Sequence, residues 1–156
     1  DKADDLSIPR MLLSREPAVE SGFPLWLQTF ELLTIGNGVG ADLPWLQESP
    51  AAHVPATWES WGEIHPETAR EHGIRDGGWA WIDSPRGRLR VRARFYRGTR
   101  PDVVSMPVGL GHKAGGRWAK NRGSDPSDLV AGVANPGAGL TVRAHTRVQI
   151  RPAKEV

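Results

Sequence analysis

The sequence contains no cysteine among its 156 residues. It therefore cannot form a disulfide, and it supplies no cysteine ligand to an iron–sulfur cluster and no thiol nucleophile. No apolar run reaches the roughly 18–20 residues that a membrane-spanning helix needs, and no signal peptide is recognisable. Neither a nucleophile-elbow motif (G-x-S-x-G) nor a P-loop is present. These absences exclude thiol enzymes and weaken the case for a hydrolase or a nucleotide triphosphatase.

Lysine is scarce, since the twenty basic residues comprise sixteen arginines and four lysines, against eighteen acidic residues. Arginine is suited to bidentate contacts with carboxylate or phosphate and to ion pairs at interfaces. Seven arginines lie between Arg86 and Arg100, and over 88–95 they alternate with apolar residues. This alternation places them on one face of a strand, with no interleaved, exposed aromatic platform to stack on bases. We expect a solvated or protein-contacting face rather than a nucleic-acid-binding one.

Glycine and proline, in contrast, are abundant, with eighteen and thirteen residues respectively. So many turn-forming and helix-breaking residues argue against a helical bundle and favour a single, mainly β domain with many turns. The chain also holds seven tryptophans and one tyrosine. So many indoles predict extensive packing, either in the core or against another subunit.

The hydrophobic pattern predicts six strands, at 25–35, 58–64, 79–83, 88–96, 102–107 and 140–150, the last most regular over Thr146–Ile150. A short helix is expected to begin at Pro66 and end before Gly73, and a further helical turn is expected within 43–57. Six strands with one or two short helices are typical of a small β-barrel. The Gly-rich segment 108–135 has little periodicity, and long loops in compact domains are usually functional or disordered.

Four segments together resemble one family: H-P-E-T-A-R-E-H-G-I-R-D-G (65–77), S-P-R-G (84–87), G-T-R-P-D-V-V (98–104) and M-P-V-G-L-G-H (106–112). Their order resembles the C-terminal molybdopterin-dinucleotide-binding domain of the dimethyl-sulfoxide-reductase-type oxidoreductases. The resemblance runs from about Phe23 to Pro152. The G-L-G-H segment and the G-R-W-A that follows resemble the polysulfide, thiosulfate, tetrathionate and arsenate reductase branch most.

The resemblance implies a six-stranded double-psi β-barrel over residues 23–152. The first residues mix charge and proline without sustained periodicity, so we expect an arm or linker over 1–22, and residues 153–156 form a tail. The resemblance further implies binding of bis-molybdopterin guanine dinucleotide, whose Mo or W is held by the rest of the enzyme. The implied partners are the remainder of the molybdopterin catalytic subunit and an iron–sulfur electron-transfer subunit, with no nucleic acid and no membrane span. The resemblance also favours an extracytoplasmic location.

Two Gly-rich loops are the main candidate cofactor sites. In the loop Thr34–Gly40, Gly38 lets backbone N–H groups approach a phosphate, and Thr34 and Asn37 can add hydrogen bonds. In the segment 106–112, Gly109 and Gly111 allow close approach of a pterin or pyrophosphate, to which His112 can donate. The resemblance places both loops at the cofactor; a plain flexible loop and a structural histidine are the alternatives.

Further candidates extend the second loop. Arg117 can pair with a pyrophosphate, and Trp118 lies beside it in the sequence. Asp125 can accept from guanine or ribose, although it stands where the family often has asparagine in a pattern like G-x-N-x-N-x-L. Asn135 begins N-P-G-A-G, where the family often shows D-P-x-S-G, and is expected in a turn near the cofactor.

No catalytic residue and no metal ligand is predicted in this chain. His65, His72 and Asp76 contain groups suited to acid–base chemistry, but the resemblance makes their segment a structural crossover between strands. His112 has no second histidine or carboxylate at the spacing of a metal site. Alone, the chain is expected to have no activity.

Two other functions stay open. The barrel could be a cofactor-free structural or interaction subunit of a larger respiratory complex, as the altered asparagine positions and the many tryptophans would suit. A free-standing barrel with its own enzymatic activity is the third, and no catalytic constellation supports it. The loop 108–128 distinguishes the first two functions, because it either surrounds a dinucleotide or folds against protein.

Overall fold

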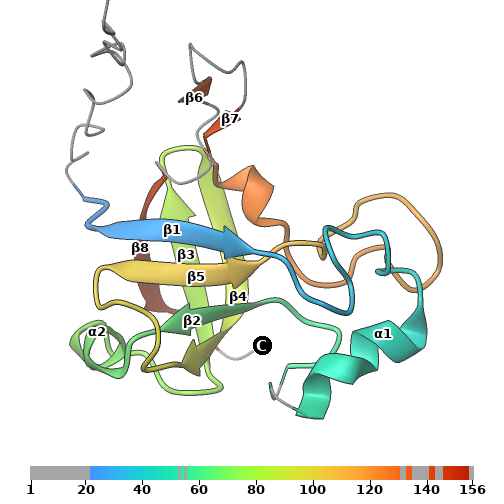
Figure 1. Ribbon diagram of the computed structural model, residues 1–156. Coiled ribbons are helices and arrows are strands. Elements are labelled where there is room, and N and C mark those ends of the chain that lie inside the picture. Colours follow the sequence, from blue (N-terminus) through green and yellow to red (C-terminus); the bar gives the residue numbers. More distant parts are fainter. Residues whose placement is uncertain are drawn as a thin grey trace, which may run out of the picture.

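Six strands close into a barrel in the computed structural model, which describes residues 22–52, 54, 56–130, 133–134, 141–142 and 146–154 (Figure 1). The barrel strands are β1 (Leu25–Phe30), β2 (Trp61–Ile64), β3 (Trp79–Ser84), β4 (Gly87–Phe95), β5 (Val103–Pro107) and β8 (Arg147–Pro152). The other elements are α1 (Pro44–Glu48), α2 (Pro66–Glu71), the 3₁₀ turns Ser49–Ala52 and Pro126–Asp128, and a two-stranded sheet of β6 (Val133–Ala134) and β7 (Thr141–Val142).

The strand order around the barrel is β1-β5-β2-β4-β3-β8. Two neighbouring pairs, β1 with β5 and β2 with β4, are parallel, and every other pair is antiparallel. Parallel neighbours require crossover connections, which here are supplied by the long segments between them. The prediction of a mainly β, six-stranded double-psi barrel with one or two short helices is confirmed, and the described residues form two, α1 and α2.

The barrel interior is filled by alternate residues of each strand. In β4, Leu89, Val91 and Ala93 are buried, as the alternation predicts. Gly62 of β2 also faces inward, because a Cβ added there would lie 3.3 Å from Ile82 Cδ1 and 3.4 Å from Val91 Cγ2. A Cβ at this position would be in tight contact, and the neighbouring side chains would have to shift by a few tenths of an ångström.

The α2 segment follows its sequence signals closely. The His65 side chain caps the helix by accepting a hydrogen bond from the Glu67 N–H at 3.3 Å, and Pro66 occupies the first turn. Gly73 adopts a left-handed conformation (φ +66°), and the Ile74 N–H donates to the Ala69 carbonyl at 2.8 Å. Ile74 is then buried in the core. The segment connects β2 to β3, which are not neighbours in the barrel, so it is a structural crossover.

Several predicted boundaries were wrong. The first strand ends at Phe30 and not at Ile35, because the Gly36 N–H turns back to the Leu32 carbonyl at 2.7 Å. The second begins at Trp61, since Trp58 has a left-handed backbone (φ +63°). Thr141–Val142 pairs with Val133–Ala134 instead of continuing the last barrel strand.

Asp83 of β3 joins three strands through a buried carboxylate. Arg151 of β8 donates to it from Nε at 2.7 Å and from a terminal nitrogen at 3.2 Å, and Arg88 of β4 donates from Nε. Burial opposes ionisation of Asp83, but the hydrogen bonds and charges of both arginines outweigh it and lower the pKa of the Asp83 carboxyl below its ordinary value.

The arginine face of β4 contacts aromatic and acidic side chains of the same chain. The guanidinium groups of Arg90 and Arg92 both lie 4.1 Å from the centre of the Trp79 ring. Arg92 also donates to Glu59 at 2.8 Å. Sequence reasoning missed these stacks because the tryptophans lie on the neighbouring strand β3.

No helix in the described part of the chain is long and apolar enough to cross a membrane.

Candidate functional site

The candidate site is formed by the two loops that follow β1 and β5. Because these strands are parallel neighbours, their carboxyl ends lie at the same end of the barrel, and the loops 31–43 and 108–125 meet there (Figure 1). The pairing continues into the loops, since the Val108 N–H donates to the Phe30 carbonyl at 2.9 Å. The structure thus brings together two segments that the sequence separates by about seventy residues.

Glycines allow the two loops to touch. A Cβ added to Gly109 (φ +98°) would lie 2.8 Å from the Gly36 carbonyl oxygen and 2.9 Å from the Gly38 nitrogen. One added to Gly38 (φ +114°) would lie 2.8 Å from His112 Nε2. Side chains are excluded here by both backbone conformation and space. Gly38, Gly109 and His112 therefore belong to one packed site, in which the glycines serve loop-to-loop contact.

Two polar atoms in this packed region have no hydrogen-bond partner among the described residues. They are Thr34 Oγ1 and His112 Nε2, and both atoms are buried although their residues are partly exposed. Burying such an atom without a partner costs about 1–3 kcal/mol. Both residues were predicted as cofactor contacts, and a bound polar group could satisfy them.

Gly111 and Asp125 meet at the base of the second loop. The Gly111 N–H donates to the Arg122 carbonyl at 2.6 Å, and a Cβ on Gly111 would overlap the backbone of Asp125. The Asp125 carboxylate accepts from the Ser127 N–H at 2.9 Å and so caps the 3₁₀ turn 126–128. One of its oxygens is thus already engaged within the chain.

Arg117 and Trp118 lie at the far end of the second loop. Arg117 is exposed, and its guanidinium lies 4.8 Å from the centre of the Trp118 ring. The Trp118 and Trp58 rings are 5.7 Å apart, and Arg122 lies 5.5 Å from the Trp58 ring. This forms a surface of aromatic rings and positive charge, which is suited to contact an anionic, planar group.

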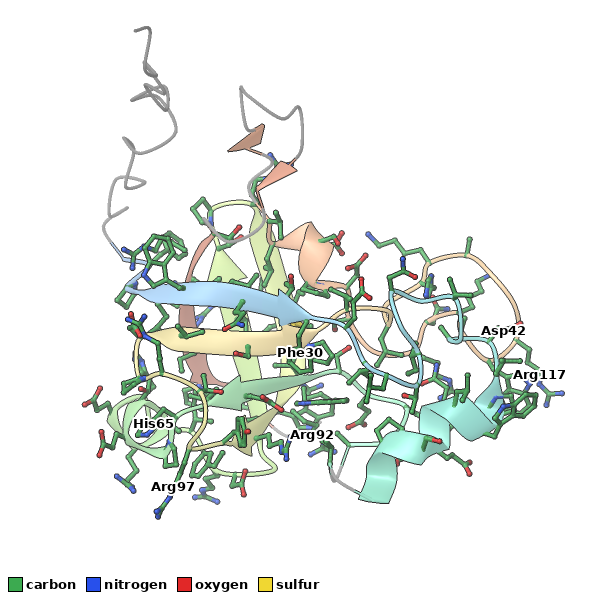
Figure 2. The ribbon with its side chains drawn as sticks, viewed as in Figure 1. Phe30, Asp42, His65, Arg92, Arg97 and Arg117 are labelled. Atoms are coloured by element: carbon green, nitrogen blue, oxygen red, sulfur yellow. The ribbon has the colours of Figure 1, made fainter. Side chains whose placement is uncertain are left out.

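Asp42 is a residue of the site that sequence reasoning missed. It follows the first loop, and its Oδ1 accepts hydrogen bonds from the backbone N–H groups of Trp118 at 2.8 Å and Ala119 at 3.1 Å. Figure 2 shows Asp42 and Arg117 at the same end of the paired loops. A lone aspartate in a loop gives no sequence signal for partners so distant in the chain.

Two predicted residues are not tied to this site. Asn37 is exposed in the first loop, and Asn135 lies outside the described residues. Within the described ranges, no group of three or more histidine, aspartate or glutamate side chains could hold a metal ion. The arrangement of the described residues offers hydrogen bonds, positive charge and aromatic surface.

A family model described as "Molydopterin dinucleotide binding domain" matches residues 48–139. The chain belongs to this family of molybdopterin-dinucleotide-binding domains. The match includes the loop after β5 with His112, Arg117, Trp118 and Asp125, and it begins after the loop that follows β1. The predicted family is therefore confirmed.

Three curated relatives are large proteins. The thiosulfate reductase molybdopterin-containing subunit PhsA of Salmonella typhimurium is 31% identical over 68% of this chain and 13% of its own length. The menaquinone reductase molybdopterin-binding-like subunit of Nitratidesulfovibrio vulgaris is 31% identical over 62% and 15%. The arsenate respiratory reductase molybdopterin-containing subunit ArrA of Shewanella sp. is 30% identical over 84% and 16%. The chain thus spans less than a fifth of these relatives.

A solved structure supports the fold. Acetylene hydratase from Pelobacter acetylenicus aligns with a TM-score of 0.67 at 16% sequence identity, covering 84% of this chain and 18% of that one. At this identity the likeness concerns the fold, and it agrees with the closed barrel described above.

Proposed function

We propose that this molybdopterin-dinucleotide-binding domain caps a bis-molybdopterin guanine dinucleotide in a Mo or W oxidoreductase. When bound, that cofactor supplies two-electron redox or oxygen- or sulfur-atom transfer. The chain's own residues bind, orient and shield it. The observation that carries the proposal is the packed loop pair, in which two predicted contacts, Thr34 Oγ1 and His112 Nε2, are buried without partners.

Each residue of the site has a role in this proposal. Thr34 and His112 supply hydrogen bonds to polar edges of the pterin or its phosphates. Arg117 supplies positive charge to the pyrophosphate, and Trp118 supplies an apolar surface that excludes water. Asp125 has one free oxygen for guanine or ribose, because the other caps the 126–128 turn.

The proposed partner is the remainder of a molybdopterin catalytic subunit. Two observations support it: the chain spans 13–16% of its curated relatives, and the segment after β1 exposes large apolar side chains. Leu33 is 107% exposed, Val39 90% and Trp45 62%. Such side chains gathered on one segment mark protein contact surfaces. An iron–sulfur electron-transfer subunit is proposed as a further partner.

The proposal is tested by measuring acid-released GMP and Mo or W in the intact protein that contains this chain. We expect His112→Ala to lower GMP content, because it removes the imidazole that faces the loop pair. His72→Ala is the matched control, since His72 follows α2, away from the paired loops. Equal GMP content in both variants and the wild type would remove His112 from the site.

One observation favours a second function, a cofactor-free structural barrel in a larger respiratory complex. The loop 108–128 is held by other parts of the same chain. Asp42 accepts a hydrogen bond from the Trp118 N–H, and the Ser60 Oγ donates to the Ser124 carbonyl and accepts from the Ser124 N–H, both at 2.8 Å. A loop already held in this way does not need a dinucleotide to order it. Under this function, the intact wild-type protein would release no GMP.

A further inference from the structure

The Asp42 carboxylate connects the two loops of the site at a point where neither is held by a strand. Its Oδ1 accepts two backbone N–H groups, from Trp118 and Ala119, which lie 76 and 77 residues further along the chain. Hydrogen bonds to an ionised acceptor are shorter and stronger than neutral ones. A carboxylate holding consecutive amides fixes the direction of the backbone between them.

The surroundings of Asp42 are built for this contact. A Cβ on Gly116 would overlap Asp42 Oδ2, so glycine is the residue that lets the carboxylate reach the loop. Beneath it, Ala41 and Ala119 are buried in one apolar cluster with Ile35 and Leu110. Ala41, which precedes Asp42, and Ala119, which donates one of the hydrogen bonds, therefore pack in the same cluster and hold the two loops together at this contact.

The two residues that this contact positions are Arg117 and Trp118, which lie between Gly116 and Ala119. Figure 2 shows the Arg117 side chain at the same end of the two loops as Asp42. Because Asp42 fixes the backbone at these positions, it also fixes the direction in which the Arg117 guanidinium and the Trp118 indole extend from the loop. Preorganising a binding loop raises affinity by reducing the ordering that binding must otherwise impose.

We propose that Asp42 is a positioning residue for the dinucleotide: it clamps the loop after β5 onto the loop after β1 and thereby presents Arg117 and Trp118 to the cofactor. The inference rests on the proposed function. In this role Asp42 acts through the loop backbone and not by touching the cofactor, because its Oδ1 accepts the two amide N–H groups.

The test compares variants of the intact protein that contains this chain. Asp42→Ala removes both hydrogen bonds, whereas Asp42→Asn keeps an oxygen acceptor. Gly116→Ala leaves the carboxylate but displaces it. The matched control is Asp76→Ala, because Asp76 Oδ1 also accepts a backbone N–H, from Phe95 at 2.7 Å. Asp76 lies in the turn between α2 and β3, and Figure 1 shows α2 at the opposite end of the barrel from α1.

Two measurements are made on each variant: the rate at which GMP-containing cofactor is lost from the purified protein, and amide exchange of the 116–119 segment by mass spectrometry. Asp42→Ala and Gly116→Ala should raise both rates by about ten-fold, which corresponds to about 1.4 kcal/mol. Asp42→Asn should remain within about three-fold of the wild type. Asp76→Ala should change neither rate.

The outcomes separate the clamp from the proposed function. If the wild type releases GMP and Asp42→Ala loses its cofactor no faster, Asp42 does not position the site. If all four variants lose cofactor equally, the effect is general destabilisation and the inference is overturned. If the wild type contains no GMP, the proposed function fails, and amide exchange alone then tests whether the clamp forms.

Discussion

Replacing Asp83 with asparagine should destabilise the barrel by about 1.5–3 kcal/mol, the range for hydrogen bonds to a charged group. The carboxylate side chain is 8% exposed, while the side chains of Arg88 and Arg151 are 53% and 45% exposed. Solvent at the arginines screens the pairs, which places the expected cost below the 3–5 kcal/mol of a fully buried pair. Asparagine keeps one acceptor, but its NH₂ group faces guanidinium donors.

The assay is urea unfolding, monitored by tryptophan fluorescence. Trp81 is one of the reporting side chains, because the centre of its ring lies 5.4 Å from the Arg88 guanidinium. The matched control is Asp102→Asn, because Asp102 pairs with Arg100 at 2.8 Å on an exposed surface. Such a pair contributes about 0–1 kcal/mol. A cost for Asp83→Asn no larger than that of the control would refute a stabilising role for the buried carboxylate.

The pH dependence provides a second check on Asp83. Its pKa is lowered in the folded state, so its ionised form stabilises the fold fully above the unfolded-state value, which is about 3.9. That stabilisation is lost as pH falls through the lowered folded-state pKa. The difference in unfolding free energy between wild type and Asp83→Asn should therefore be constant near neutral pH and shrink below about pH 4. A difference that does not shrink in acid would contradict the linkage.

Two glycine substitutions follow from the packing. Gly62→Val should destabilise the barrel by about 1–3 kcal/mol, because its side chain would press on Ile82 and Val91; unfolding by urea measures it, and a neutral effect would show that the interior has room. Gly109→Ala should lower the GMP content of the intact protein, since a Cβ there would lie 2.8 Å from the Gly36 carbonyl oxygen; unchanged GMP content would show that the loops need not touch to bind.

Local signals in the sequence were sufficient for the parts of the fold that depend on local chemistry. The alternation of β4 and the proline and glycine that bound α2 act over a few residues, and the structure follows them. The end of β1 was misplaced because 31–35 continues the apolar character of the strand. Leu33 is nonetheless fully exposed, which the local propensity of these residues does not predict.

The site required contacts that no local pattern encodes. Gly38, Gly109 and His112 were predicted separately, but their packing against one another follows from the parallel pairing of β1 with β5. Asp42 and Asp83 have partners 76 and 68 residues away. A single aspartate becomes a loop clamp or a strand junction only once strand order and register are known.

The most direct test of cofactor binding is the content of GMP and of Mo and W in the intact wild-type protein, purified under anoxic conditions. The account predicts that acid treatment releases GMP and that one of the two metals is present with it. Active, intact protein that yields neither GMP nor either metal would contradict a cofactor-capping role for this domain.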